Sequence, residues 1–322
     1  MAAQNISLVL SLNMPAIVRT PAWSRPPRDD GGVKVRFALS MGLGSTEPGE
    51  LATMAVQAEA LHFDTLWFSD VPSLASVDPL LAVAFIGART AKVKLGINLI
   101  PFGYEPYRIA NKIAQLDRMV GGRLLVTLVP GLETPPERAA LGTLGRHRGR
   151  MMEEVIPQFR AWWAGETLPV AEGLQLALPT LPVQDPFEIW LGGSGPEAVV
   201  RAGRFSDGWL GSLVTAERAG QIRTGIQQAA EVAGRWIDPE HFGLSIGYAR
   251  RPEDLGRATR IRRPTEGDIA DLVPVGAGAL RSYLGRLIDN GMSKFVVRPV
   301  APVESWPDEL EWLAGTVLDL QT

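Results

Sequence analysis

Short apolar runs alternate with segments of helical periodicity along most of this 322-residue chain. Each run has the length of a buried strand, and between the runs apolar residues recur every three to four positions, as in Ile109, Ile113 and Leu116. Eight alternations of strand and helix predict a closed parallel (β/α)8 TIM barrel, with an open doubly wound sheet as the alternative. The predicted strands are Val35–Leu39, Asp64–Ser69, Val93–Ile100, Leu124–Val129, Phe187–Leu191, Gly208–Gly211, Leu244–Tyr248 and Phe295–Arg298.

Three stretches rich in proline, glycine or charge are longer than a simple barrel needs: Leu132–Arg146, Glu166–Pro186 and Arg250–Gly276. The first and third follow strands, so we expect them on the face of the barrel that carries active sites, as lids over a substrate. The second follows a helix and is expected outside the site.

Residues 1–32 differ in composition from the rest of the chain. The apolar run Ile6–Leu12 has no positive charge before it and no clear small-residue cleavage site after it, which argues against a signal peptide. Four prolines and the segment Asp29–Gly32 follow, as in a linker. We expect an N-terminal arm over 1–32 and one barrel domain over 33–322.

The overall composition excludes several classes of protein. A net charge of −3 without a basic run argues against a nucleic-acid partner. No apolar segment is long enough to span a bilayer, so no membrane partner is expected. The chain has no cysteine, which fits a reducing cytoplasm.

A glycine-rich turn follows the predicted strand that ends at Leu191. Gly192, Gly193, Ser194 and Gly195 precede Pro196, which opens a helical pattern. Such a turn allows backbone N–H groups to approach an anion at a helix N-terminus, so it is a candidate phosphate cradle. An ordinary strand-to-helix turn is the alternative.

Other catalytic machinery is sparse. The three histidines stand apart, which argues against a zinc hydrolase, and we expect no metal site. The lysines lie at strand beginnings or in a helix, which argues against a Schiff-base enzyme. Asp70 and Glu133 could form the carboxylate pair of a glycoside hydrolase, a weak alternative. A site with few ionisable groups is expected where a cofactor supplies the reactivity.

Five blocks of sequence, taken in order, resemble the luciferase-like monooxygenase superfamily, and the resemblance covers about residues 34–298. The blocks are Leu66–Asp70, Asp78–Ala82, Ala88–Gly96, Gln115–Leu124 and the glycine turn with Phe205–Trp209.

The resemblance implies a barrel that binds FMN or the deazaflavin coenzyme F420, often as a homodimer. The first hypothesis is an FMN-dependent monooxygenase acting on a small organic substrate, with a flavin reductase as a partner that supplies reduced cofactor. The alternative is a deazaflavin-dependent reductase or dehydrogenase, and a further one is a non-catalytic flavin-binding barrel. The absence of a lysine near the cradle tilts the expectation towards FMN, although Arg201, Arg218 or Arg250 could hold a polyanionic tail.

The family's functional positions transfer to this chain through the same blocks. The cofactor phosphate would lie against the cradle, and residues at the ends of four other strands would surround the ring. Asn98–Leu99 matches a position where the family often has a non-proline cis peptide. The implied cofactor-binding residues are Ser69, Asn98, Leu99, Val129, Pro130, Gly131, Gly193, Ser194, Gly211 and Ser212.

Asp70 is the expected catalytic residue. Many family members have a histidine just after this strand, but here Val71 and Pro72 follow. Asp70 could replace that histidine as general acid or base if burial raises its pKa. Alternatively, it caps the next turn. Glu133 is displaced by one residue from the acidic position of some deazaflavin-dependent members and is not expected to be catalytic.

Overall fold

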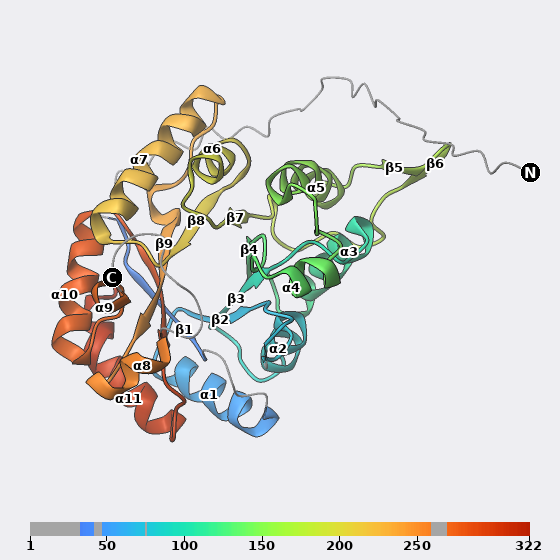
Figure 1. The fold of residues 1–322 in the computed structure, drawn as a ribbon. Helices are drawn as coiled ribbons and strands as arrows, with labels where there is room; N and C mark the ends of the chain where they lie inside the picture. Colours follow the sequence, from blue (N-terminus) through green and yellow to red (C-terminus); the bar gives the residue numbers. More distant parts are fainter. Residues whose placement is uncertain (1–32, 42–46, 75, 259–268) are drawn as a thin grey trace, which may run out of the picture.

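The computed structural model describes residues 33–41, 47–74, 76–258 and 269–322 (Figure 1). The arm expected over 1–32 lies outside the described residues.

Eight parallel strands close into a barrel, so the TIM-barrel prediction is confirmed and the open-sheet alternative is wrong. The order around the barrel is β1-β10-β9-β8-β7-β4-β3-β2. Every strand overlaps a predicted apolar run. The strands are β1 (Arg36–Ser40), β2 (Thr65–Ser69), β3 (Lys94–Leu99), β4 (Leu124–Leu128), β7 (Ile189–Leu191), β8 (Gly208–Ser212), β9 (Phe242–Tyr248) and β10 (Lys294–Pro299).

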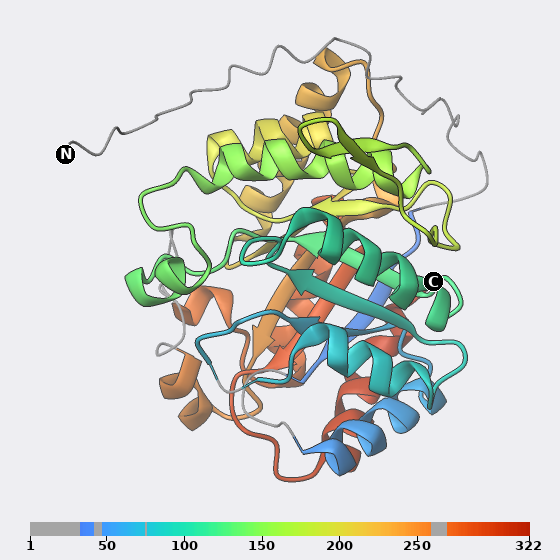
Figure 2. The same cartoon turned by 90° about the vertical axis from the view of Figure 1, so that its right-hand side faces the viewer.

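Helices follow the strands and surround the barrel (Figure 2). Proline occupies the first turn of many of them, where its missing N–H costs no hydrogen bond. The described α-helices are α1 (Pro48–Ala60), α2 (Pro79–Gly87), α3 (Pro106–Met119), α4 (Pro135–Ala140), α5 (Arg148–Trp163), α6 (Pro196–Phe205), α7 (Ala216–Val232), α8 (Leu255–Ala258), α9 (Ile269–Leu272), α10 (Gly276–Asp289) and α11 (Trp306–Val317). Short 3-10 turns cover Pro239–His241, Pro252–Asp254 and Leu318–Leu320.

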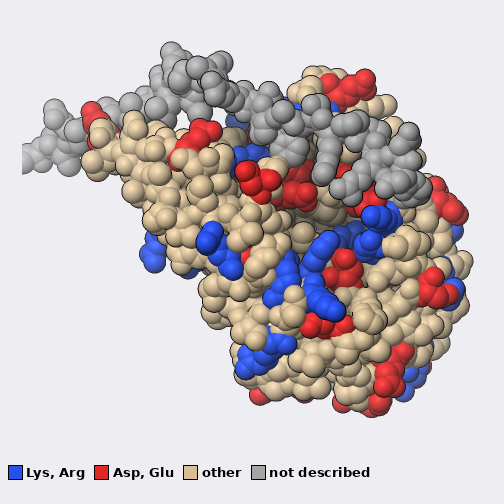
Figure 3. All heavy atoms as spheres, turned by 180° about the vertical axis from the view of Figure 1, so that it is seen from behind, with Lys and Arg blue, Asp and Glu red and all other residues tan. Residues whose placement is uncertain are grey.

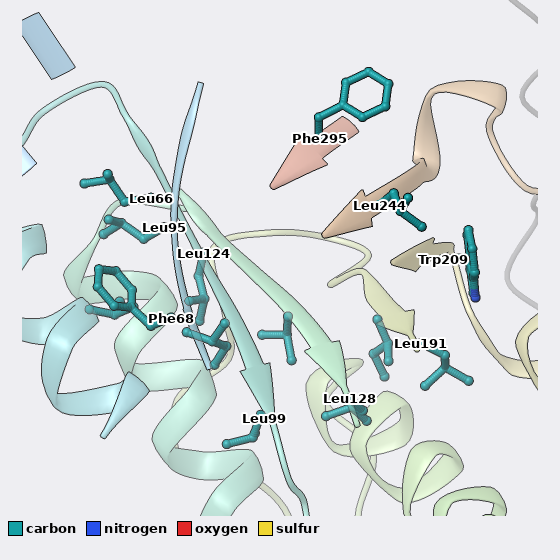
Figure 4. Packing of buried hydrophobic residues seen from close by; sticks show 14 of the residues in the cluster. Leu66, Phe68, Leu95, Leu99, Leu124, Leu128, Leu191, Trp209, Leu244 and Phe295 are labelled. Carbon is teal, nitrogen blue, oxygen red and sulfur yellow. The ribbon is translucent and has the colours of Figure 1, made fainter. Parts of the chain in front are cut away.

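Successive strand residues face opposite sides of the barrel wall, as the period of two requires. Outward-facing side chains such as Leu66, Phe68 and Leu95 pack in the main hydrophobic core with the surrounding helices (Figure 4). A smaller cluster of Ala38, Trp67, Trp190, Leu210 and Val296 occupies the interior.

The two indoles of the interior lie against glycines of neighbouring strands. A Cβ at Gly96 would overlap the ring of Trp67, and one at Gly208 would overlap that of Trp190. Both tryptophans are nearly inaccessible to solvent and occupy the interior of the barrel.

At the amino ends of the strands, Lys294 of β10 is buried and donates a 2.7 Å hydrogen bond to Asp64. This ion pair lies at the opposite end of the barrel from the carboxyl ends of the strands, where active sites of such barrels occur, so we assign it to stability.

The three long segments differ in structure. Residues 132–146 contain α4. Residues 166–186 form a hairpin of β5 (Leu168–Ala171) and β6 (Leu174–Leu176), which projects away from the barrel (Figure 1). Trp162 anchors it by donating a 3.1 Å hydrogen bond to the Leu176 carbonyl. The third contains α8 and α9, and its residues 259–268 lie outside the described part of the chain.

In the described ranges, no helix is both long and apolar enough to cross a bilayer. Basic and acidic side chains lie interspersed on the face shown in Figure 3.

Candidate functional site

A cavity of about 300 Å³ lies at the carboxyl ends of the strands; we call it the mouth cavity. Ten of the eleven residues predicted for the site line it: Ser69, Asp70, Asn98, Val129, Pro130, Gly131, Gly193, Ser194, Gly211 and Ser212. The segments that contain Leu132 and Val273 contribute to its wall, whereas the β5–β6 hairpin does not. The expected placement of the three long segments is therefore confirmed.

The structure differs from the expectation at two points at the end of β3. Leu99 does not line the cavity: it is fully buried in the main core, because Asn98 faces the barrel interior and the next residue must face outward. The Asn98–Leu99 peptide bond is not cis, since among the described residues only Asp185–Pro186 is. Instead, β3 stays in regular register with β4 through the pair Leu99 and Leu128.

The cradle at the start of α6 depends on two glycines and a tryptophan. Gly193 has φ +108°, and a Cβ there would lie 2.8 Å from Ala198. Trp209 of β8 donates a 2.8 Å hydrogen bond from its indole to the Gly193 carbonyl, which fixes the turn from behind. The N-cap residue, Gly195, provides no side-chain cap for α6. First-turn N–H groups without a cap are what an anion at a helix N-terminus uses.

A polar chain forms the floor of the cavity. Trp67 donates to the Asn98 side-chain oxygen at 3.1 Å, and the Asn98 amide donates to the Ser69 hydroxyl at 2.9 Å. These bonds fix the orientation of the amide and the hydroxyl. The hydroxyl of Thr127, next to Asn98 in the sheet, is buried and has no hydrogen-bond partner among the described residues.

Asp70 lies directly after β2 at the edge of the cavity. Its carboxylate accepts a 3.1 Å hydrogen bond from the Ile100 backbone N–H, so it bridges to the end of β3 and does not cap its own turn. Burial raises the pKa of Asp70 from 3.8 to about 6, and the charges of Asp78 and Glu137 add to this, while the Ile100 N–H opposes it. Such a group exchanges protons near neutral pH, as a general acid or base must.

The loop after β4 forms another wall, and sequence reasoning missed the residue that holds it. Arg148, at the start of α5, donates to the carbonyls of Pro130, Gly131 and Leu132 at 2.8, 3.0 and 2.8 Å. The same guanidinium pairs with Glu133. No local pattern links an arginine to carbonyls that lie sixteen to eighteen positions before it, so only the fold shows this contact.

The alternative pair of a glycoside hydrolase is not supported by the geometry. The side chain of Glu133 is 79% exposed, pairs with arginines and does not line the mouth cavity. Among the described residues that do line it, Asp70 and Arg298 are the charged ones. No group of three or more histidine or acidic residues in the described ranges could hold a metal ion.

A second cavity, which we call the side cavity, adjoins the cradle and shares Pro130, Gly192 and Gly193 with the mouth cavity. Basic residues predominate among its charged lining residues, which are Arg138, Arg146, Arg148, Arg201, Glu133 and Glu197. Of the three arginines proposed from the sequence for an anionic tail, only Arg201 is in this position. Arg250 pairs with Glu309 at 3.0 Å, and Arg218 lies on α7.

The fold is a closed (β/α)8 barrel with a cavity at the carboxyl ends of its strands. The chain belongs to the luciferase-like monooxygenase family, whose model matches residues 30–254. The family resemblance found in the sequence is therefore confirmed.

Two curated relatives and one solved structure illustrate the similarity. The F420-dependent hydroxymycolic acid dehydrogenase of Mycobacterium tuberculosis is 29% identical over 60% of this chain, and the F420-dependent glucose-6-phosphate dehydrogenase of Nakamurella multipartita is 28% identical over 63%. The matches span 56% and 64% of the length of these relatives. The oxygenating constituent of 3,6-diketocamphane monooxygenase from Pseudomonas putida, solved with FMN, shares the fold with a TM-score of 0.70 and 16% identity, covering 89% of this chain and 99% of that chain.

Proposed function

We propose that this protein is an oxidoreductase that holds a flavin-type coenzyme in the mouth cavity and acts on a small organic substrate. The observation that carries the proposal is that one cavity joins an uncapped glycine cradle at α6 to a half-buried carboxyl group, Asp70, after β2. An anion anchor and a proton-exchanging group therefore face the same chamber.

The residues present fit such a coenzyme. The cradle has space above Gly195, where a Cβ would meet nothing within 4 Å, so a phosphate group could approach the backbone. Gly211 and Ser212 line the same cavity from β8. Thr127, the sheet neighbour of Asn98, does not line the cavity; its buried hydroxyl has no hydrogen-bond partner among the described residues and is a polar group that an ordered water can satisfy.

Each part of the chain has a separate role in the proposed reaction. Gly193 and Ser194 would bind the phosphate, and Val129, Pro130 and Gly131 would contact the ring. When bound, the coenzyme supplies two-electron redox chemistry, and reduced FMN can in addition activate oxygen. Asp70 would hold or release a proton at its carboxylate, and the Ile100 N–H keeps that carboxylate oriented.

Two observations favour the deazaflavin as the coenzyme. The curated relatives are named as F420-dependent dehydrogenases, and the arginines of the side cavity suit the acidic tail that distinguishes F420 from FMN. We therefore place a deazaflavin-dependent reductase or dehydrogenase first. The FMN-dependent monooxygenase is the second candidate, because the family is described by that activity.

The cellular setting is part of the same proposal. The cysteine-free sequence supports a place in the cytoplasm. The family resemblance supports a homodimer and, for the FMN reaction, a flavin reductase as partner.

Absorbance titration of the purified protein with FMN and with F420 tests the proposal. We expect saturable binding of at least one coenzyme. The variant Ser194→Asp places a negative charge at the cradle and should weaken binding by about tenfold or more, because like charges at close range repel. Thr53→Asp, an exposed position on α1, serves as the control and should bind as the wild type does. Binding of neither coenzyme, or an unchanged affinity of Ser194→Asp, would contradict the proposal.

A further inference from the structure

Glu137 is a buried acidic residue in one of the two long segments that contribute to the wall of the mouth cavity. It lies on α4, within residues 132–146, and is 2% exposed. Burying a carboxylate costs free energy unless hydrogen bonds compensate for the lost water. The hydrogen-bond donors to the Glu137 carboxylate therefore indicate its structural role.

The Glu137 carboxylate connects α4 to two loops at once. One oxygen accepts a 2.7 Å hydrogen bond from the Leu132 backbone N–H in the loop after β4. The other accepts a hydrogen bond from the Ser73 hydroxyl in the loop after β2. Both loops line the mouth cavity, through Val71 and Leu74 on one side and Pro130 and Leu132 on the other.

Two side chains of opposite charge thus hold the backbone of the loop after β4. Arg148 binds its carbonyls, and Glu137 binds the N–H of Leu132. Between them, Gly131 adopts φ +78°, and a Cβ there would lie 3.1 Å from Glu137 Oε1. Among the described residues, the hydrogen bonds of the Arg148 guanidinium go to this loop, whereas Glu137 also accepts one from the loop that follows Asp70.

We propose that Glu137 is a positioning residue that fastens the two loops to each other and fixes the wall of the mouth cavity beside Asp70. Its use in catalysis rests on the proposed function, but its structural effect rests only on these contacts. The test therefore uses the protein without coenzyme, so that a failure of the proposed chemistry leaves this test unaffected.

Glu137 also acts on Asp70 through its charge. The ionisable groups around Asp70 are Asp78 at the N-cap of α2, Tyr104 after β3, and Glu137 on α4. Burial is the main cause of the raised pKa of Asp70, and the negative charges of Asp78 and Glu137 add to it. Removing the charge of Glu137 while keeping its shape should lower the pKa of Asp70.

Three variants separate the effect of the hydrogen bonds of Glu137 from the effect of its negative charge. Glu137→Gln keeps an oxygen for Leu132 and removes the charge; Ser73→Ala removes only the link between the loops; Glu137→Ala removes both links. Glu154→Gln on the exposed face of α5 is the control. Two quantities are measured: the midpoint of the Asp70 carboxyl titration by ¹³C NMR, assigned with Asp70→Asn, and the hydrogen exchange of the Leu74 and Leu132 amides.

Glu137→Gln should lower the Asp70 midpoint while Leu132 exchanges nearly as in the wild type. Glu137→Ala should accelerate exchange of both amides by about tenfold or more, since each loop loses a hydrogen bond to a charged group. Ser73→Ala should accelerate exchange of Leu74 alone. An unchanged Asp70 midpoint in Glu137→Gln, or unchanged Leu74 exchange in Ser73→Ala, would overturn the proposal; these two variants decide the matter even if Glu137→Ala fails to fold.

Discussion

The properties of Asp70 follow from its position rather than from its residue type. An aspartate after a barrel strand is ordinarily ionised at neutral pH. Here burial and two neighbouring acids favour the protonated form, and a single backbone N–H favours the ionised form. The balance brings the pKa to about 6, where one side chain can both take up and release a proton.

The raised pKa makes the stability of the fold depend on pH in a defined direction. Because the folded-state pKa of about 6 exceeds the ordinary value of 3.8, the native state binds this proton more tightly than the unfolded chain does. The contribution to stability is complete below about pH 3.8 and is lost as the pH rises through about 6.

Asp70→Asn should therefore gain stability relative to the wild type as the pH rises, since an amide does not ionise. The difference in melting temperature, variant minus wild type, is expected to be more positive at pH 8 than at pH 4. Thermal unfolding at both values measures it, with the exposed Asp289→Asn as the control. Equal differences at the two pH values would show that Asp70 titrates normally.

At the scale of single elements, the strand period decides which residues reach the site. In β2, Trp67 and Ser69 face inward and Phe68 packs outside; in β3, Gly96 and Asn98 face inward. At inward positions, a large residue on one strand lies against a glycine on the next, as Trp67 does against Gly96. The glycine leaves space for the large side chain in the narrow barrel interior.

Gly96→Ala tests this arrangement. The added methyl group would overlap the ring of Trp67, and we expect a loss of about 1–3 kcal/mol in the free energy of unfolding, as for other overpacked cores. Chemical denaturation measures the loss. Gly278→Ala is the matched control, because nothing lies within 4 Å of its Cβ on α10 and alanine is favoured in a helix by about 0.5–1 kcal/mol. Equal stabilities of the two variants would mean that Trp67 can move aside.

The same period explains what could be predicted from the sequence. Apolar runs of strand length located all eight strands, and the glycine turn and Asp70 were found because each follows such a run. Leu99 was assigned to the site through its neighbour Asn98, although adjacent strand residues point to opposite faces. The roles of Glu137 and Arg148 could not be predicted, since each depends on loop atoms that only the folded chain brings near.

At the scale of the whole molecule, the position of charge relative to the two cavities distinguishes the candidate coenzymes. The chain as a whole has a net charge of −3. The side cavity beside the cradle differs, because it is lined by more basic than acidic residues. A ligand with several negative charges would extend from the cradle over these arginines, whereas the phosphate of FMN would end at the cradle itself.

Arg146→Glu should consequently affect the two coenzymes differently. Arg146 is exposed and lines the side cavity, so its reversal should weaken F420 binding about threefold to tenfold, an effect that shrinks with added salt, and change FMN binding less than about twofold. Titrations at low and high ionic strength measure this, with Arg118→Glu on α3 as the control. An equal loss for both coenzymes would place Arg146 at the phosphate instead.

The tryptophans in the barrel interior determine from which side a ligand can enter the mouth cavity. Since Trp67 and Trp190 block the path towards the amino ends of the strands, the mouth cavity is a blind chamber on that side. A molecule resting on the floor formed by Asn98 and Ser69 must arrive before the one that covers it and must leave after it. If this chamber holds both a coenzyme and a substrate, as the proposed function requires, the ligand nearest the floor would therefore enter first and leave last.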